Sequence, residues 1–302
     1  MPQMVSATLL HVGLHKTAST SLQATCGLNR DLLESKGYNY PALFNSDGGA
    51  RTENHSIALF NIFSSSRLSY HQNVGKRRGL IESDVSVYRR LLLLALLKKN
   101  TLILSGEDVS DLSVNEQEGL ATYLSAFSGT LKTFAVVRSP YSLHCSAFSG
   151  MVNNGRDLKP GAFLSQLEKI KKLRTSFRQR GNLSEIKFIP FSVAAATSQG
   201  AIQFILESMG MNGIDGLKPV VANEGFSNEQ TRRQMALNSM SPRLIGRKVN
   251  KDWRRAPKVK GPKFLLSKKE LGLIMPQLLD ENKWFEEHLG MEFCDNSFPT
   301  CD

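Results

Sequence analysis

Short apolar runs, each followed by a polar loop or a helical stretch, constrain the fold of this chain most. Ala7 to Val12 (ATLLHV), Thr101 to Leu104 (TLIL) and Thr133 to Val137 (TFAVV) have the pattern of buried strands, and Ile186 to Ile189 is a candidate fourth. Amphipathic stretches separate these runs, the first from about Ser19 to Glu34. This alternation predicts an α/β fold with a central parallel sheet and helices on both faces, whose ligands bind beyond the carboxyl ends of the strands.

The rest of the chain is predicted to be mainly helical. The helices expected there are Val85 to Leu97, Pro160 to Arg180, Ser198 to Met209, Ser227 to Asn238, and Ser267 to His288 with a break near Pro276. The Pro- and Lys-rich residues 241–263 are expected to form a loop or flap, and 41–80 to be insertions on the acceptor side. One domain over residues 1–302 accommodates all of this.

Composition places the chain among ordinary globular proteins, with 41% hydrophobic and 22% charged residues. Its four cysteines form no CxxC pair and no Cys/His ligand spacing, so we expect neither a disulfide scaffold nor a metal site, and a reducing, cytoplasmic location. The longest aliphatic run, Leu91 to Leu97, is far shorter than the ~20 residues that a membrane-spanning helix needs.

The net charge of +11 comes from one segment. Arg243 to Lys269 holds eleven Lys and Arg against one acid, Asp252, which leaves 27 bases (38 − 11) and 26 acids (27 − 1) elsewhere. Such a patch favours an anionic partner: nucleotide phosphates, an acidic glycan or nucleic acid.

The loop after the first strand carries the pattern of an anion site. In HVGLHKTASTSLQ, Gly13, Lys16 and a cluster of hydroxyl residues lie between a buried strand and a helix start. Backbone N–H groups and the helix dipole at such a start attract anions, and the lysine adds a formal charge. A nucleoside-triphosphate P-loop ends in Gly-Lys-[Ser/Thr], whereas here Lys16 precedes the hydroxyls. A polar helix cap, for which Ser19 suffices, is the structural alternative.

The KTASTS stretch resembles the 5′-phosphosulfate loop of sulfotransferases that use 3′-phosphoadenosine 5′-phosphosulfate (PAPS). The resemblance implies an α/β three-layer sandwich of the P-loop-like sulfotransferase type. Ala18 stands where the family usually has Gly, and Ser21 where many eukaryotic members have Trp. The donor-binding residues that the resemblance implies in this loop are His15, Lys16, Thr17, Ala18, Ser19, Thr20 and Ser21.

A second signature of the same family lies after the third apolar run. Arg138 follows TFAVV, and Ser146 comes eight residues later, in the spacing with which the family holds the 3′-phosphate of PAPS. Pro140 suits the first turn of a helix that carries Ser146. An Arg fork can grip a phosphate with paired hydrogen bonds. The alternatives are a surface ion pair for Arg138 and a helix-packing role for Ser146.

Sulfuryl transfer needs a general base for the acceptor hydroxyl and a positive group at the leaving oxygen. Lys16 is the positive group, and no metal is required. Glu107 follows the second apolar run, where the resembling family has its catalytic His or Glu, and is the first candidate for the base. His55, in RTENHSIALF, is the second, as base or acceptor ligand.

The basic segment offers a weaker likeness. Arg247-Lys248 followed by Asp252-Trp253 resembles the family's RKGxxGDWK element over the 3′-phosphate, but lacks both glycines and is one residue short. A solvated basic loop and a grip on an acidic glycan acceptor are the other interpretations.

The resemblance therefore implies a PAPS-dependent sulfotransferase that acts on a hydroxyl, with a carbohydrate or another metabolite as the expected acceptor, and releases adenosine 3′,5′-bisphosphate. One alternative is a P-loop-type small-molecule kinase, which needs Mg²⁺ and a carboxylate to hold it. The other is a non-catalytic polyanion-binding protein. Nucleic acid is not expected as a partner, because only Trp253 and Phe264 are interleaved with the basic residues. The sequence leaves the oligomeric state and the acceptor open.

Overall fold

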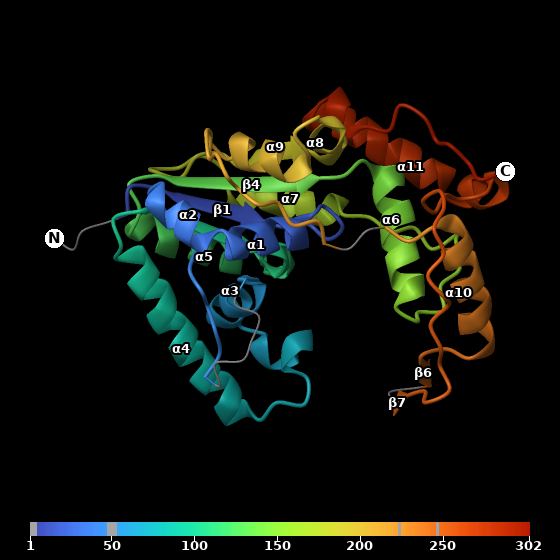
Figure 1. Ribbon diagram of the computed structural model, residues 1–302, viewed down its shortest axis with the longest axis horizontal. Coiled ribbons are helices and arrows are strands. Elements are labelled where there is room, and N and C mark those ends of the chain that lie inside the picture. The colour runs from blue at the N-terminus through green and yellow to red at the C-terminus, as the bar shows by residue number, and fades with distance from the viewer. Residues whose placement is uncertain (1–4, 47–52, 223–224, 246–247) are drawn as a thin grey trace. The chain divides into compact units, whose positions relative to one another are not determined.

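The computed structural model describes residues 5–46, 53–222, 225–245 and 248–302 (Figure 1). Its contacts divide the chain into two compact units. The first comprises Met1–Val137 and Leu167–Ala222, and the second Arg138–Gln166 and Asn223–Asp302. That residues 1–302 form one functional domain stays a prediction.

The first unit is built on a five-stranded sheet, which confirms the predicted α/β class. The strand order is β2-β3-β1-β4-β5, and every neighbouring pair is parallel. In register, His11 of β1 lies beside Ser105 of β3, so both strands end at the same edge. The strands are β1 (Thr8–Val12), β2 (Tyr38–Asn39), β3 (Thr101–Gly106), β4 (Leu131–Val137) and β5 (Lys187–Pro190).

Helices cover both faces of this sheet, because the strands are apolar on both sides. On one face Leu9 and Phe134 pack with Leu22 and Ile205. These contacts bring α1 (Ser19–Leu28) and α9 (Ala201–Ser208) onto that face. The neighbouring Leu10 points the other way and is fully buried. The first unit also contains α2 (Arg30–Ser35), α3 (Ser56–Phe63), α4 (Arg78–Leu96), α5 (Val114–Ala126), α7 (Leu167–Ser176), α8 (Phe191–Ala196) and the 3₁₀ turns η1 (Arg67–Ser69), η2 (His71–Asn73) and η3 (Glu107–Asp111).

The second unit has its own apolar core. Phe148 and Val152 of α6 pack with Ile274 and Leu278 of α11 and with Phe264. The elements of this unit are α6 (Pro140–Asn153), α10 (Asn228–Met240), α11 (Lys268–His288), η4 (Met291–Phe293) and the antiparallel hairpin of β6 (Leu244–Ile245) and β7 (Lys248–Val249).

Three helix predictions need correction. The helix expected from Ser19 to Glu34 is interrupted at Asn29, whose side chain hydrogen-bonds the backbone of Lys218 in both directions. The helix expected from Pro160 begins only at Leu167. The break expected near Pro276 does not occur. Helix α11 continues through this residue, and the capping box at Ser267 defines its start.

The flap predicted at 241–263 is mostly irregular, as expected, but contains the β6–β7 hairpin. Within the described residues, no helix has the length and apolarity that crossing a membrane requires.

Candidate functional site

The turn between β1 and α1 has an unusual backbone. Lys16 and Ala18 both have positive φ, 70° and 63°, whereas Thr17 between them does not. A turn of this kind can direct successive N–H groups toward one side, which is the backbone arrangement found in anion-binding concavities. Ala18, which stands where the resembled family usually has Gly, thus adopts a left-handed conformation that glycine accommodates without strain. In a non-glycine residue such a conformation costs ~1–2 kcal/mol.

The start of α1 leaves its first N–H groups available to an anion. Its N-cap is Ala18, which has no side chain that can cap, and no acidic residue lies in the first turn. Lys16 and Thr20 are exposed beside this helix start. The polar-cap alternative is wrong, because Ser19 is the first helical residue and does not cap the helix.

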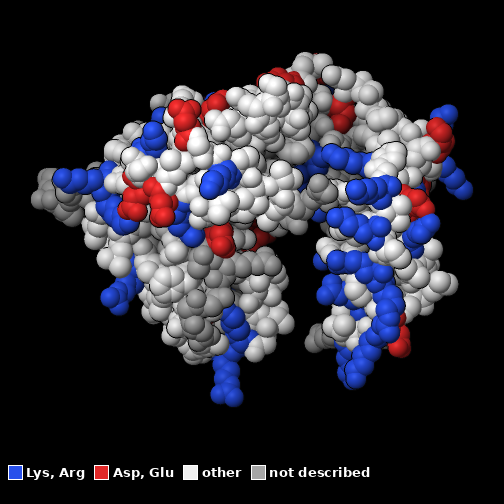
Figure 2. All heavy atoms as spheres, in the orientation of Figure 1, with Lys and Arg blue, Asp and Glu red and all other residues white. Residues whose placement is uncertain are grey.

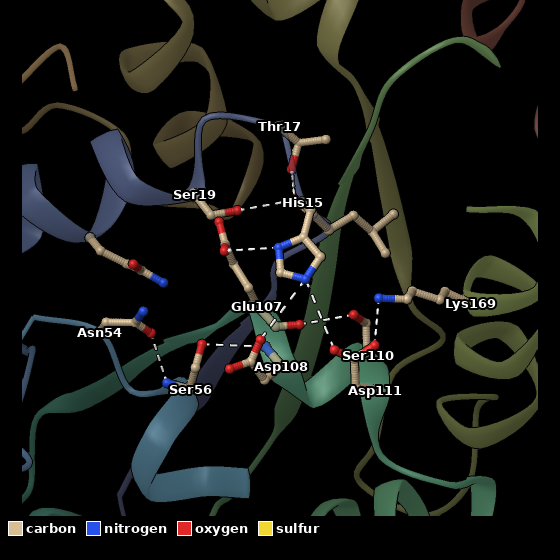
Figure 3. Close-up of polar contacts among 12 residues, drawn as sticks. His15, Thr17, Ser19, Asn54, Ser56, Glu107, Asp108, Ser110, Asp111 and Lys169 are labelled. Atoms are coloured by element: carbon tan, nitrogen blue, oxygen red, sulfur yellow. Dashed lines mark hydrogen bonds and ion pairs between the residues drawn. The ribbon is translucent and has the colours of Figure 1, made fainter. Parts of the chain in front are cut away.

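The other hydroxyls of the loop form hydrogen bonds within the protein, and Figure 3 shows this for Thr17 and Ser19. Thr17 Oγ1 donates to the carbonyl of Leu14, and Ser19 Oγ lies 3.4 Å from the same oxygen. Ser21 Oγ donates to Ala222 O and accepts from Ala222 N–H, at 3.2 and 3.0 Å. These hydroxyls shape the loop and attach it to its neighbours. The candidates for contacting an anion are therefore the backbone N–H groups, Lys16 and Thr20.

Glu107 lies against this loop. It follows β3 as the first residue of η3, and a methyl group on Gly13 would come within 2.7 Å of both Glu107 Cγ and Ser19 Oγ. The parallel pairing of β1 and β3 brings the ends of the two strands together. The structure thus places the predicted base beside the predicted anion loop.

His15 bridges the loop to three carboxylates (Figure 3). Its Nδ1 lies 3.3 Å from Glu107 Oε2, and its Nε2 lies 4.0 Å from Asp108 Oδ1 and 3.9 Å from Asp111 Oδ2. The carboxylates of Asp111 and Glu107 outweigh partial burial and raise the pKa of His15 to about 9. His15 is therefore protonated at neutral pH, and its ring nitrogens face carboxylates, while its predicted contact with the donor stays a prediction.

Sequence reasoning did not single out the partners of these carboxylates. Lys169 forms an ion pair with Asp111, and the hydroxyl of Tyr70 donates to Asp108. Burial alone raises the pKa of Asp111, but hydrogen bonds from His15 and Lys169 lower it to about 2. Burial raises the pKa of Asp108. The EDVSD run after the second apolar strand is the signal for the two aspartates, whereas nothing local marks Lys169 or Tyr70.

Part of this cluster has the geometry of a cation site. His15, Asp108 and Asp111 each offer one ligand atom, and these atoms lie within 4.8 Å of one another. Because Lys169 already binds Asp111, a divalent cation would have to compete with an ammonium group.

His55 is buried and has a structural role instead of the predicted catalytic one. Its Nδ1 accepts from the N–H of Ser105 at 3.1 Å, and its Nε2 lies 2.8 Å from Pro41 O, to which it donates. Burial lowers the pKa of His55 to about 4. With both ring nitrogens engaged, His55 fixes the end of β3 that leads to Glu107 and has no free nitrogen for a substrate proton.

Arg138 and Ser146 belong to the second unit, where α6 carries the serine. Arg138 Nε donates to Ser142 Oγ at 2.9 Å, and burial lowers the pKa of this guanidinium to about 10. Ser146 follows Ser142 by one helical turn, so the two hydroxyls share a face of α6. Arg138 is half-buried, so the surface-ion-pair alternative for it stays open. Sequence reasoning missed Ser142.

The basic segment contributes one described residue to the predicted donor site. Lys248 lies exposed on β7, whereas Arg247 lies outside the described residues.

Comparison with known proteins adds two structural similarities. No protein-family model and no curated protein sequence matches the chain, while 4 solved chains match its structure. A sulfotransferase from Alicyclobacillus acidocaldarius is 15% identical, with a TM-score of 0.40 over 76% of this chain and 91% of that one. A chain from the PezAT toxin–antitoxin system of Streptococcus pneumoniae is 10% identical, with a TM-score of 0.32 over 78% and 85%. At these scores the similarities carry no further argument, and the fold class rests on the strand order and register.

Proposed function

We propose that this chain is a sulfotransferase that moves a sulfuryl group from PAPS to an acceptor hydroxyl. One observation carries the proposal: the turn over residues 13–21 combines two left-handed residues with an uncapped helix start, next to the Glu107 carboxylate. Strained backbone conformations of non-glycine residues cluster at functional sites. Turns that direct successive N–H groups to one side bind anions, which supports a phosphosulfate site here.

The residues of the first unit fit the chemistry. The acceptor oxygen forms a bond to sulfur while the bond from sulfur to the bridging phosphate oxygen breaks. Glu107 takes the proton of the acceptor hydroxyl. Lys16 and the N–H groups at the start of α1 stabilise the negative charge that the leaving bisphosphate gains.

His15 prepares Glu107 for this role. The protonated imidazole lies 3.3 Å from one carboxylate oxygen, so it orients the side chain and leaves the other oxygen for the acceptor. The role of Arg138 and Ser146 at the 3′-phosphate, and of Lys248 near it, rests on the sequence resemblance. The acceptor class, a carbohydrate or another hydroxyl-bearing metabolite, and the cytoplasmic location are likewise proposals.

A kinase acting on a small molecule is the second candidate, and the carboxylate cluster favours it. Phosphoryl transfer requires Mg²⁺ held by carboxylates, and Asp108 and Asp111 are the groups that could hold it. The loop sequence does not favour this candidate, since no Gly-Lys-[Ser/Thr] ends it.

Calorimetric titration separates the two candidates. The protein is titrated with adenosine 3′,5′-bisphosphate, adenosine 5′-monophosphate, and ATP with Mg²⁺. We expect metal-independent binding of the bisphosphate that is at least tenfold tighter than binding of the monophosphate. Arg138→Ala should abolish this preference, because it removes the guanidinium group that is proposed to hydrogen-bond the 3′-phosphate. Arg178→Ala, at an exposed arginine, should leave the preference unchanged.

The opposite results are equally informative. Tighter binding of ATP with Mg²⁺, lost on adding a chelator, would replace the sulfotransferase with the kinase. Absence of binding to all three nucleotides would leave the polyanion-binding alternative.

A further inference from the structure

Two apolar side chains of the second unit stand exposed and adjacent on the β6–β7 hairpin. Leu244 of β6 lies directly opposite Val249 of β7, and residues opposite each other in an antiparallel pair project from the same face. Leu244 is 55% and Val249 64% exposed, and Met240, at the end of α10, is 77% exposed. Single exposed apolar residues are ordinary, but grouped ones mark an interaction site.

Basic side chains surround this apolar pair. Figure 2 shows Lys and Arg gathered over the part of the second unit that carries α10, β6 and β7. In the described part of residues 243–263, no Lys or Arg forms an ion pair with a carboxylate, and Asp252 is the one acid in that range. The exposed cations, here called the basic surface, are Arg243, Lys248, Lys251, Arg254, Arg255, Lys258, Lys260 and Lys263.

Specific hydrogen bonds hold the segment in place. Buried Asn238 accepts from Trp253 Nε1 at 3.0 Å, and buried Gln234 accepts from the N–H of Ala256 at 2.7 Å. At the base of the hairpin, the Asn250 side chain donates to Ser241 Oγ and to Pro242 O, both at 2.9 Å. A merely solvated loop needs no such attachment, so the segment is presented in a fixed form.

An anionic membrane surface matches both features. Apolar side chains enter the headgroup region of a bilayer, while Lys and Arg bind its anionic lipids. A soluble polyanion would leave Leu244 and Val249 in water. Single-stranded nucleic acid would need exposed aromatic rings for stacking, yet Arg243 covers the Trp253 ring and Phe264 is buried. A second copy of the chain would bring two basic surfaces together.

We propose that strands β6 and β7 and the basic surface bind anionic lipid bilayers, with Leu244 and Val249 inserted at the interface. This peripheral binding does not depend on the proposed sulfotransferase activity.

Co-sedimentation with vesicles tests the proposal. The protein should bind phosphatidylcholine vesicles that contain phosphatidylserine, and bind pure phosphatidylcholine at least tenfold more weakly. Leu244→Ser with Val249→Ser should weaken binding at least tenfold, because two apolar side chains no longer leave water. The matched control, Leu273→Ser with Leu279→Ser, changes two residues of similar exposure on α11 and should leave binding unchanged.

A second set of variants tests the charges. Replacing Lys251, Arg255 and Lys258 by Gln should weaken binding about fivefold per residue, since each basic residue near an anionic surface contributes about 1 kcal/mol. The control replaces three exposed basic residues of the first unit, Lys36, Arg89 and Lys99, by Gln. Circular dichroism checks that each variant is folded.

Several results would overturn the proposal. One is vesicle binding that survives the serine pair but not the charge variants, with equal affinity for soluble heparin or duplex DNA, since this indicates a soluble polyanion. Another is equal binding to both vesicle types, or to neither. A third is a concentration-dependent dimer that the serine pair dissociates, because this assigns the apolar pair to a second copy.

Discussion

Gly13 and Glu107 are so close that the glycine has no room for a side chain: a Cβ on Gly13 would lie 2.7 Å from Glu107 Cγ and 3.0 Å from Glu107 Cα. The end of β1, which leads into the turn over residues 13–21, thus packs directly on the proposed base. This contact joins the two halves of the candidate site within the first unit.

Gly13→Ala should displace Glu107 and destabilise the protein by about 1–3 kcal/mol, because the added methyl overpacks a backbone contact. Chemical denaturation measures the loss. Gly119→Ala, on α5 with nothing within 4 Å of its Cβ, is the control and should stabilise the protein by about 0.5–1 kcal/mol. Equal effects at the two glycines would show that the Gly13 contact is not as tight as its geometry indicates.

Ala18→Gly should stabilise the protein by about 0.5–1 kcal/mol. Glycine removes the ~1–2 kcal/mol strain of the left-handed conformation. The larger conformational entropy that glycine has in the unfolded chain offsets part of this gain. Ala24→Gly, in the middle of α1, should instead destabilise by about 1 kcal/mol. Thermal unfolding of both variants tests this. If Ala18→Gly destabilises as much as Ala24→Gly, the turn does not hold residue 18 in the left-handed region.

The pH dependence of stability should have a component that belongs to His15. The folded pKa is raised to about 9 from an ordinary 6.5, so the stabilisation is complete below pH 6.5 and is lost as the pH rises toward 9. His15→Gln should flatten the unfolding free energy in that window. The loss of stability at acidic pH should remain in this variant. Burial lowers the pKa of His11, His55 and His144 to about 4, so their contribution to the free energy of unfolding is lost only as the pH falls below 6.5. An unchanged alkaline limb in His15→Gln would contradict the ion pair with Glu107.

Asp295 should be needed for the start of α6. Its carboxylate accepts from Ser139 Oγ and from the N–H of Tyr141, each at 2.6 Å, and so caps a helix whose own N-cap side chain does not. Asp295→Ala should cost about 2 kcal/mol of stability, measured by denaturant unfolding. Asp280→Ala, at an exposed position of α11, should change stability by less than about 0.5 kcal/mol. A similar loss in both would argue against the cap.

The sequence determined the parallel sheet and the position of the anion loop. β1, β3, β4 and β5 all lie where apolar runs predicted them, because strands buried on both faces must be apolar throughout. Glu107 could be placed near Lys16 for a similar reason: parallel neighbours end at the same edge. Ala18 stood out as a departure from a family pattern, but only the backbone showed that it adopts the positive φ of glycine.

Tertiary partners decided the rest, since their sequence separation leaves no local signal. Ser21 was predicted to bind an anion, yet it hydrogen-bonds Ala222, and Asn29 ends α1 through Lys218. The imidazole of His55 is occupied at both nitrogens by Ser105 and Pro41. Residue types and their periodicity thus specify strands and a charged loop, because these depend on neighbours in the chain. Which polar side chains remain available for chemistry depends on the distant groups that folding brings to them.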